Sequence, residues 1–255
     1  MSTARLVIAP RSRGITERLA SVSMEQVGGL AALLLAAGYV AIMPLFASVG
    51  AAPAGAQAAL EYHSTGTAAW RGIVALSVAT DLLFVPLSVA LYVALRRFGR
   101  AAMLVATIFT LLFVALDLAV LWPAKVSLIS LGQQYATATG ARRELLLAAA
   151  GYPEAVLDSV VASVYSVLTL GIGILATGIV MLRSGARRAT AIVGVATGTL
   201  GIASVAETAM TGSFPVLVVA ASLLTIAWLI LVGWGLLRSW WPVDGSSAYA
   251  SRPGA

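Results

Sequence analysis

Four acidic residues lie within or at the ends of long apolar stretches of this 255-residue sequence, namely Asp81, Asp117, Asp158 and Glu207. A carboxyl group in such surroundings can exchange a proton or bind a cation. Ser77 precedes Asp81 by four residues, which places both side chains on one face if the stretch is helical. We therefore predict a pocket or ion-binding site built from these five residues, with Asp81 as the first candidate.

Glu61 and His63 are weaker candidates, two residues apart in a predicted loop. Together with Asp117 or Glu207 they could ligate a divalent metal ion, and the sequence leaves this question open. The chain has no cysteine and this single histidine, which excludes disulfides, thiolate metal sites and a three-histidine zinc site within one chain. No catalytic residue and no cofactor is predicted, because no nucleophile is spaced to pair with a base.

The composition indicates an integral membrane protein. Hydrophobic residues make up 60% of the chain and charged residues only 10%, against about 25% charged in soluble domains. Four stretches without Asp, Glu, Lys or Arg approach or exceed the ~20 residues needed to cross a bilayer. They are Gln26–Leu60, Ser159–Leu182, Ala189–Ala206 and Thr208–Leu237. The predicted partner is therefore the lipid bilayer and not nucleic acid, although the net charge is +6.

The sequence predicts an all-α bundle of six transmembrane helices over residues 26–240. The expected spans are about 27–49, 72–95, 101–122, 155–182, 189–208 and 215–237. Residues 1–25 are predicted to form a cytoplasmic tail and residues 241–255 a disordered cytoplasmic tail.

The polar connection between the third and fourth predicted spans covers Lys125–Glu154. Pro123 is expected to end or kink the helix before it. Within the connection, ARRELLLAAAGYP predicts a short amphipathic helix broken by Gly151 and Pro153.

Basic residues predict the orientation in the plasma membrane. With the N-terminus inside, twelve of the sixteen basic residues fall on cytoplasmic segments and four on outer segments, as the positive-inside rule requires. Both termini are therefore predicted to be cytoplasmic. The segment GAAPAGAQA after the first span resembles a signal-peptidase site, but the apolar stretch is long for a cleaved signal, so we expect a retained anchor.

The acids are distributed unevenly across the predicted membrane. Asp81 follows Arg71 by ten residues, which places it about 15 Å deep, near the middle. Asp117 falls in the outer half of its span and Glu207 near the outer end of its own. No acid falls in the inner half of any span. A helical bundle can bring Asp81, Asp117 and Glu207 together on one outward-facing cavity, and the sequence leaves open whether it does.

Small residues recur along the fourth and fifth spans, at Ser159, Ser163, Ser166, Gly173 and Thr177, and again at Gly194, Gly198 and Gly201. Small side chains let helix backbones approach closely inside a membrane. We interpret both series as helix-packing faces.

Two segments carry a resemblance to a known family. They are FVPLSVALYVALRR (Phe84–Arg97), which closes the second span, and LRSGARRATAIVGVATGTLGI (Leu182–Ile202), which joins the fourth to the fifth. Over roughly residues 25–240 the chain resembles a family of bacterial six-span membrane proteins catalogued as a domain of unknown function. The resemblance implies the six-span fold and brings no established activity.

Two functions are compatible with these patterns. The first is a small carrier or binding protein whose outward-facing acidic pocket takes a proton, a cation or a cationic small molecule, as the acids in the outer half favour. The alternative is a non-catalytic subunit or scaffold whose Gly- and Ser-rich faces bind partner helices, in a homo-oligomer or with another membrane subunit. An intramembrane enzyme is the least favoured, because the nucleophile–base pair is missing.

Overall fold

The computed structural model describes residues 23–51, 53, 55–211 and 216–238. Every regular element in these residues is a helix, and five of the helices are long and apolar enough to cross a membrane. The all-α, membrane-compatible class is thus confirmed. The predicted tail at 241–255 and residues 1–22 of the N-terminal tail lie outside the described residues.

Helix α2 (Met24–Val49) starts and ends at clear local signals. The Ser23 hydroxyl accepts from the Gln26 backbone N–H at 3.2 Å, and the Gln26 side chain accepts from the Ser23 backbone N–H at 3.1 Å. This capping box satisfies two N–H groups that the first turn leaves unpaired. The helix stops at Gly50, whose φ of 80° suits glycine.

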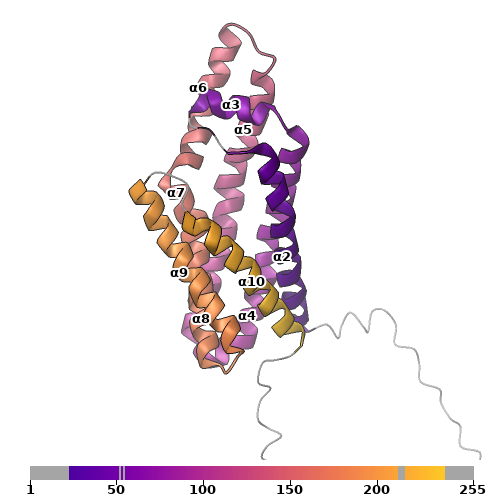
Figure 1. The fold of residues 1–255 in the computed structure, drawn as a ribbon, viewed down its shortest axis with the longest axis vertical. Coiled ribbons are helices and arrows are strands. Elements are labelled where there is room, and N and C mark those ends of the chain that lie inside the picture. Colours follow the sequence, from indigo (N-terminus) through magenta and orange to yellow (C-terminus); the bar gives the residue numbers. More distant parts are fainter. Residues whose placement is uncertain (1–22, 52, 54, 212–215, 239–255) are drawn as a thin grey trace, which may run out of the picture.

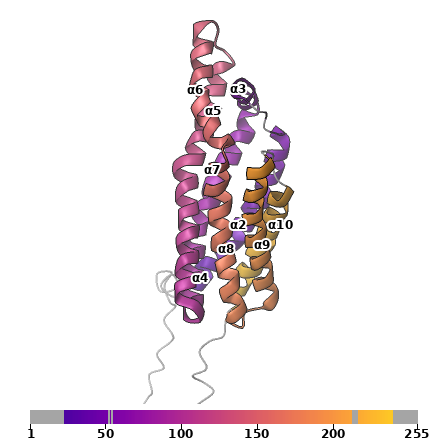
Figure 2. The same ribbon diagram turned by 90° about the vertical axis from the view of Figure 1, so that its left-hand side faces the viewer.

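Helix α4 (Thr67–Leu116) is a hairpin of two helical arms. Its helical geometry breaks at Gly99, between the predicted spans 72–95 and 101–122. The rings of Phe84 and Phe113 lie 5.3 Å apart, whereas 29 residues of straight helix would separate them by about 43 Å. The second arm therefore runs back along the first, as Figures 1 and 2 show.

The second arm continues into the predicted connection without a break. A π-helical turn, η1 (Asp117–Leu121), leads into α5 (Trp122–Tyr135), and α6 (Ala141–Asp158) follows. The prediction that Pro123 ends the helix is wrong, because helical structure runs from Asp117 through Pro123 to Tyr135. Pro123 follows directly on the π-helical turn, where the regular hydrogen-bond ladder is already shifted, so its missing N–H is tolerated.

The predicted break at Gly151 and Pro153 is also wrong. Helix α6 runs through both residues, with Pro153 buried alongside Leu146 and Ala150. Burial of these apolar side chains offsets the poor helix propensity of glycine and proline. The helix ends instead at Ser159, and the next helical segment of membrane-spanning length begins at Val160.

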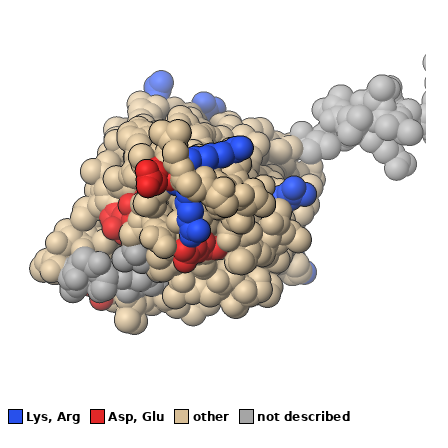
Figure 3. Space-filling model, turned by 90° about the horizontal axis from the view of Figure 1, so that it is seen from above, with Lys and Arg blue, Asp and Glu red and all other residues tan. Residues whose placement is uncertain are grey.

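Helices α3 (Ala56–Ser64), α5 and α6 form a separate apolar core at one end of the molecule, which we call the capped end. This core contains Leu60, Leu128, Tyr135, Ala138, Leu146 and Ala150. The capped end projects beyond the rest of the bundle in Figure 1. Figure 3 looks onto it and shows acidic and basic side chains side by side.

The opposite end, which we call the basic end, carries the chain reversals at Gly99 and between α8 (Thr169–Arg183) and α9 (Arg188–Thr211). Its described arginines are Arg96, Arg97, Arg100, Arg183, Arg187, Arg188 and Arg238. A Cβ built on Gly99 would lie 3.3 Å from Val180 of α8, so the two reversals are neighbours.

The rest of the bundle comprises α7 (Val160–Ser163), η2 (Val164–Leu168), α8 (Thr169–Arg183), α9 (Arg188–Thr211) and α10 (Val216–Leu237). Glycines set the approach of α8 to α9. A Cβ on Gly198 would lie 2.6 Å from the Gly171 carbonyl oxygen, and one on Gly178 would lie 2.7 Å from the Val195 backbone nitrogen. Gly194 and Gly198 therefore belong to a close helix-packing face.

Helix α10 packs on α2 at the basic end. A Cβ on Gly233 would lie 2.9 Å from the Gly29 carbonyl oxygen, so the two backbones nearly touch there. From this contact the two helices diverge toward the capped end, as Figure 1 shows. The first and last described helices thus close the bundle at one end only.

We expect Gly178→Ala to destabilise the protein by about 1–3 kcal/mol, because the new methyl group would press on backbone atoms of α9. The matched control is Gly151→Ala in α6, where a Cβ would meet nothing within 4 Å. The measurement is thermal unfolding of both variants in detergent. Equal melting temperatures for the two would contradict this account of the α8–α9 interface.

Candidate functional site

A cavity of about 650 Å³ lies inside the bundle, between α2, both arms of α4 and helices α8, α9 and α10. Its walls are mainly apolar and aromatic, and two carboxyl groups reach it, those of Asp81 and Asp117. Ser77 and Thr80 line it next to Asp81. Three of the predicted site residues, Ser77, Asp81 and Asp117, thus share one cavity.

Asp81 lies on the first arm of α4 and is only 4% exposed. The Trp122 indole N–H donates to its Oδ2 atom at 2.7 Å. This bond links residues 41 positions apart and ties the first arm to the start of α5. A charge-assisted bond of this kind orients the carboxyl group and removes part of its burial cost.

Asp117 begins the π-helical turn η1 on the second arm and is 7% exposed. Its Oδ1 atom is buried and has no hydrogen-bond partner among the described residues. The two carboxyl groups are close enough to interact electrostatically, and Tyr39 of α2 interacts with both. A buried oxygen without a donor is costly, so Asp117 is the cavity acid that most needs a partner.

The cavity lacks a compensating positive charge, because none of the described residues that line it is basic. Two ionised carboxylates in apolar surroundings repel each other and are poorly solvated. A proton or a bound cation relieves both costs. The arrangement is therefore suited to hold positive charge.

Glu207 lies elsewhere, near the end of α9. Its Oε2 atom accepts from the Leu217 backbone N–H at 3.4 Å, in the first turn of α10, where a carboxylate also interacts favourably with the helix dipole. Asp158 is the exposed last residue of α6. Neither residue lines the cavity, so Asp81 and Asp117 converge on it and Glu207 does not.

Glu61 and His63 belong to α3 at the capped end. Glu61 is exposed, accepts from Gln57 at 3.0 Å and lies 3.7 Å from the Arg143 guanidinium. His63 is buried against Trp70, with ring centroids 4.5 Å apart, and its Nδ1 atom lies 2.7 Å from the Ala59 carbonyl oxygen. The described residues contain no group of three His, Asp or Glu side chains that could hold a metal ion.

Tyr39 and Trp122 are the site residues that sequence patterns did not single out. In the sequence Trp122 is an aromatic residue at a predicted helix end, and its partner Asp81 lies 41 residues earlier, on the first arm of α4. Tyr39 is one aromatic residue within an apolar span. No sequence signal distinguishes either from an ordinary membrane-facing aromatic residue.

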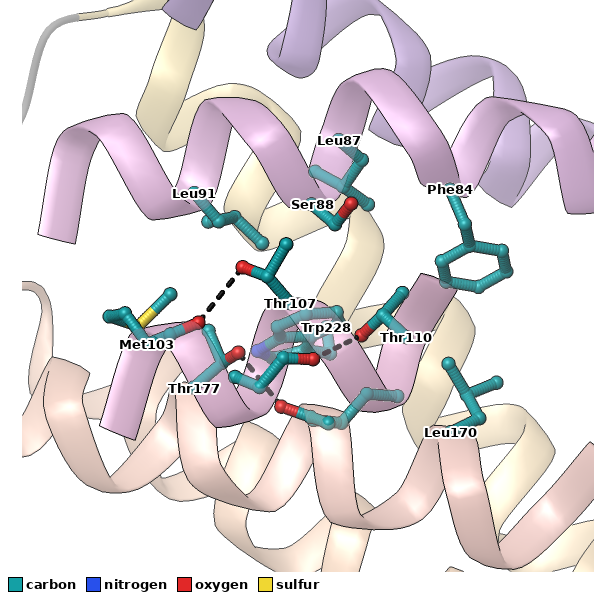
Figure 4. A pocket seen from close by; sticks show the side chains of 13 residues that line it. Phe84, Leu87, Ser88, Leu91, Met103, Thr107, Thr110, Leu170, Thr177 and Trp228 are labelled. Atoms are coloured by element: carbon teal, nitrogen blue, oxygen red, sulfur yellow. Dashed lines mark hydrogen bonds between the residues drawn. The ribbon is translucent and has the colours of Figure 1, made fainter. Parts of the chain in front are cut away.

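A second, much smaller void of about 10 Å³ lies next to the cavity, and the two share Leu170 and Ile174 in their walls. Figure 4 shows the hydroxyls of Thr107, Thr110 and Thr177 around it, each donating to a carbonyl of its own helix. The void is about the size of one water molecule. Phe84 lines this void, and Phe113 lines the cavity. The two phenyl rings are in edge-to-face contact, so the wall of the void touches the wall of the cavity at this pair.

Comparison with protein-family models, curated proteins and solved structures finds no match to this chain. The resemblance to the six-span family therefore stays a prediction.

We expect Trp122→Phe to cost about 1–3 kcal/mol of stability, because it leaves a buried Asp81 oxygen without its donor. In an Asp81→Asn background the same change should cost less, since the bond is no longer charge-assisted. The measurement is a double-mutant cycle of unfolding in detergent. Additive effects of the two substitutions would show that the negative charge of Asp81 adds nothing to the bond.

The burial of His63 predicts that the stability of the protein depends on pH. Burial lowers the pKa of His63 to about 4, with the Ala59 carbonyl acting against that shift and Lys125 adding to it. In the unfolded chain the value is about 6.5. Between these two values the unfolded state binds more protons, so stability should fall as the pH is lowered through this window.

The variant His63→Phe keeps the ring contact with Trp70 and cannot be protonated. Unfolding of both proteins measured at pH 7 and pH 4.5 should show a smaller loss for the variant. Parallel losses would exclude His63 as the source of the dependence.

Proposed function

We propose that this chain is a small membrane carrier or binding protein whose acidic pocket takes a proton, a cation or a cationic small molecule. The observation that carries the proposal is the joint burial of Asp81 and Asp117 in one cavity, with no basic residue among the described residues of its lining. Such a site binds positive charge more favourably than it binds a neutral or anionic ligand.

We further propose that the bundle crosses the membrane six times, with the two arms of α4 as separate crossings. The contact between Phe84 and Phe113 supports this count, because antiparallel arms that pack along each other can each span the bilayer. The arginines of the basic end support a cytoplasmic location for that end. With the capped end outside, the gap between α2 and α10 then widens toward the outer side of the plasma membrane (Figure 1).

The alternative function, a scaffold that binds partner helices through small residues, gains less support. Gly194 and Gly198 contact Gly178, Gly171 and Leu175 of α8 within the same chain. These glycine faces are therefore occupied internally. Burying two carboxyl groups costs free energy, and a scaffold would gain nothing from that cost.

The test is uptake of protons, sodium, potassium and an organic cation by proteoliposomes that contain the full chain. We expect Asp81→Asn and Asp117→Asn each to reduce uptake or binding at least about tenfold, because each removes one negative charge from the cavity. Asp158→Asn is the matched control, since this exposed acid lies outside the cavity.

The substitutions are isosteric, and the amide oxygen that Asp81→Asn introduces can still accept from Trp122. Normal gel-filtration profiles of the variants show that they remain folded. If neither protons, nor the metal ions, nor the organic cation bind, the proposed function is wrong. It is also wrong if binding does not change in either cavity variant.

A further inference from the structure

We infer that the ligand of the acidic cavity is an organic cation with an apolar body, and that it reaches the cavity sideways from the bilayer between α2 and α10. This inference rests on the proposed function and names its substrate class. Three observations carry it: the size of the cavity, the chemistry of its wall, and the position of its opening.

The cavity is too large for a bare ion. At about 650 Å³ it falls within the range of roughly 300–1,000 Å³ that is typical of small-molecule sites. A dehydrated metal ion needs several oxygen ligands at close range, and the described residues bring no three acidic or histidine side chains together. The volume and the ligand set both favour a molecule over an ion.

The wall combines negative charge with aromatic surface. Tyr39, Phe46, Phe113 and Trp122 line the cavity together with the two carboxyl groups. Aromatic faces attract organic cations and at the same time pack against apolar groups. The buried and unpartnered Oδ1 atom of Asp117 supplies negative charge for the cationic centre. A molecule with one cationic centre and an apolar body satisfies all of these groups.

The opening of the cavity lies on the side of the bundle. Met43 of α2 and Val219 of α10 line the cavity and are 41% and 49% exposed, so they form its rim. The two helices touch at Gly29 and Gly233 near the basic end and diverge from there, as Figure 1 shows. In a membrane this rim faces lipid.

An apolar rim selects the route as well as the ligand. A hydrated inorganic ion in the bilayer interior has a high desolvation cost, whereas a lipophilic cation partitions into the membrane and can pass between α2 and α10. At the basic end α2 and α10 close on each other, so the carboxyl groups are hidden from the aqueous phase on that side. The ligand therefore arrives by way of the lipid.

The experiment measures binding of radiolabelled tetraphenylphosphonium to the full chain in lipid nanodiscs, with empty nanodiscs as the background. We expect saturable binding that a hundredfold excess of sodium or potassium does not displace. Val219→Trp, which narrows the rim, should weaken binding or slow association by about tenfold or more. Leu223→Trp is the matched control: it lies on the same helix, is 53% exposed and does not line the cavity.

The outcomes separate this inference from the proposed function. Acid-dependent binding of sodium, potassium or protons without saturable tetraphenylphosphonium binding would overturn the organic-cation inference and leave the proposed function standing. Saturable binding that is equally strong and equally fast in both tryptophan variants would overturn the lateral route. If Val219→Trp does not fold, Val219→Phe against Leu223→Phe makes the same comparison with a smaller side chain. If none of the tested cations binds to the protein, both proposals are wrong.

Discussion

The close approach of α2 to α10 at Gly29 and Gly233 is the contact on which the cavity depends. At this point the backbones nearly touch, since a Cβ on either glycine would lie about 3 Å or less from atoms of the other helix. The first and last described helices are therefore held together at the basic end. Because their axes are not parallel, they separate toward the capped end (Figure 1). The exposed residues of the cavity wall, among them Met43 and Val219, lie on these two helices.

The hairpin of α4 places the two carboxyl groups in that space. Asp81 and Asp117 are far apart in the sequence and come together only because the chain reverses at Gly99. The π-helical turn that begins at Asp117 adds one residue to the helical ladder, and such turns are frequent at functional sites. Trp122, just beyond this turn, then bonds Asp81 across the hairpin. Reversal, turn and bond together make one acidic site from two separate acids.

Sequence patterns predicted much of the helical content, because long apolar stretches without charge can only be satisfied as helices in lipid. The wrong predictions of secondary structure fall in the more polar part of the chain. The region of Lys125–Glu154 was expected to be a polar connection with a short helix, yet α5 and α6 pair with α3 in an apolar core of their own. Local signals at Pro123, Gly151 and Pro153 favoured breaks, yet helical structure runs through all three, and at Pro153 burial against neighbouring helices outweighed the local signal.

The sequence by itself determined the membrane class, the positions of the chain reversals and the acids that deserve a functional explanation, because these follow from local hydrophobicity and charge. Only the tertiary structure decided which acids meet. Asp117 joins Asp81 in the cavity, whereas Glu207 accepts from the start of α10 and His63 packs in an aromatic cluster. The reason is geometric: depth along a helix can be counted from residue numbers, but the direction of a side chain depends on how each helix rotates against its neighbours.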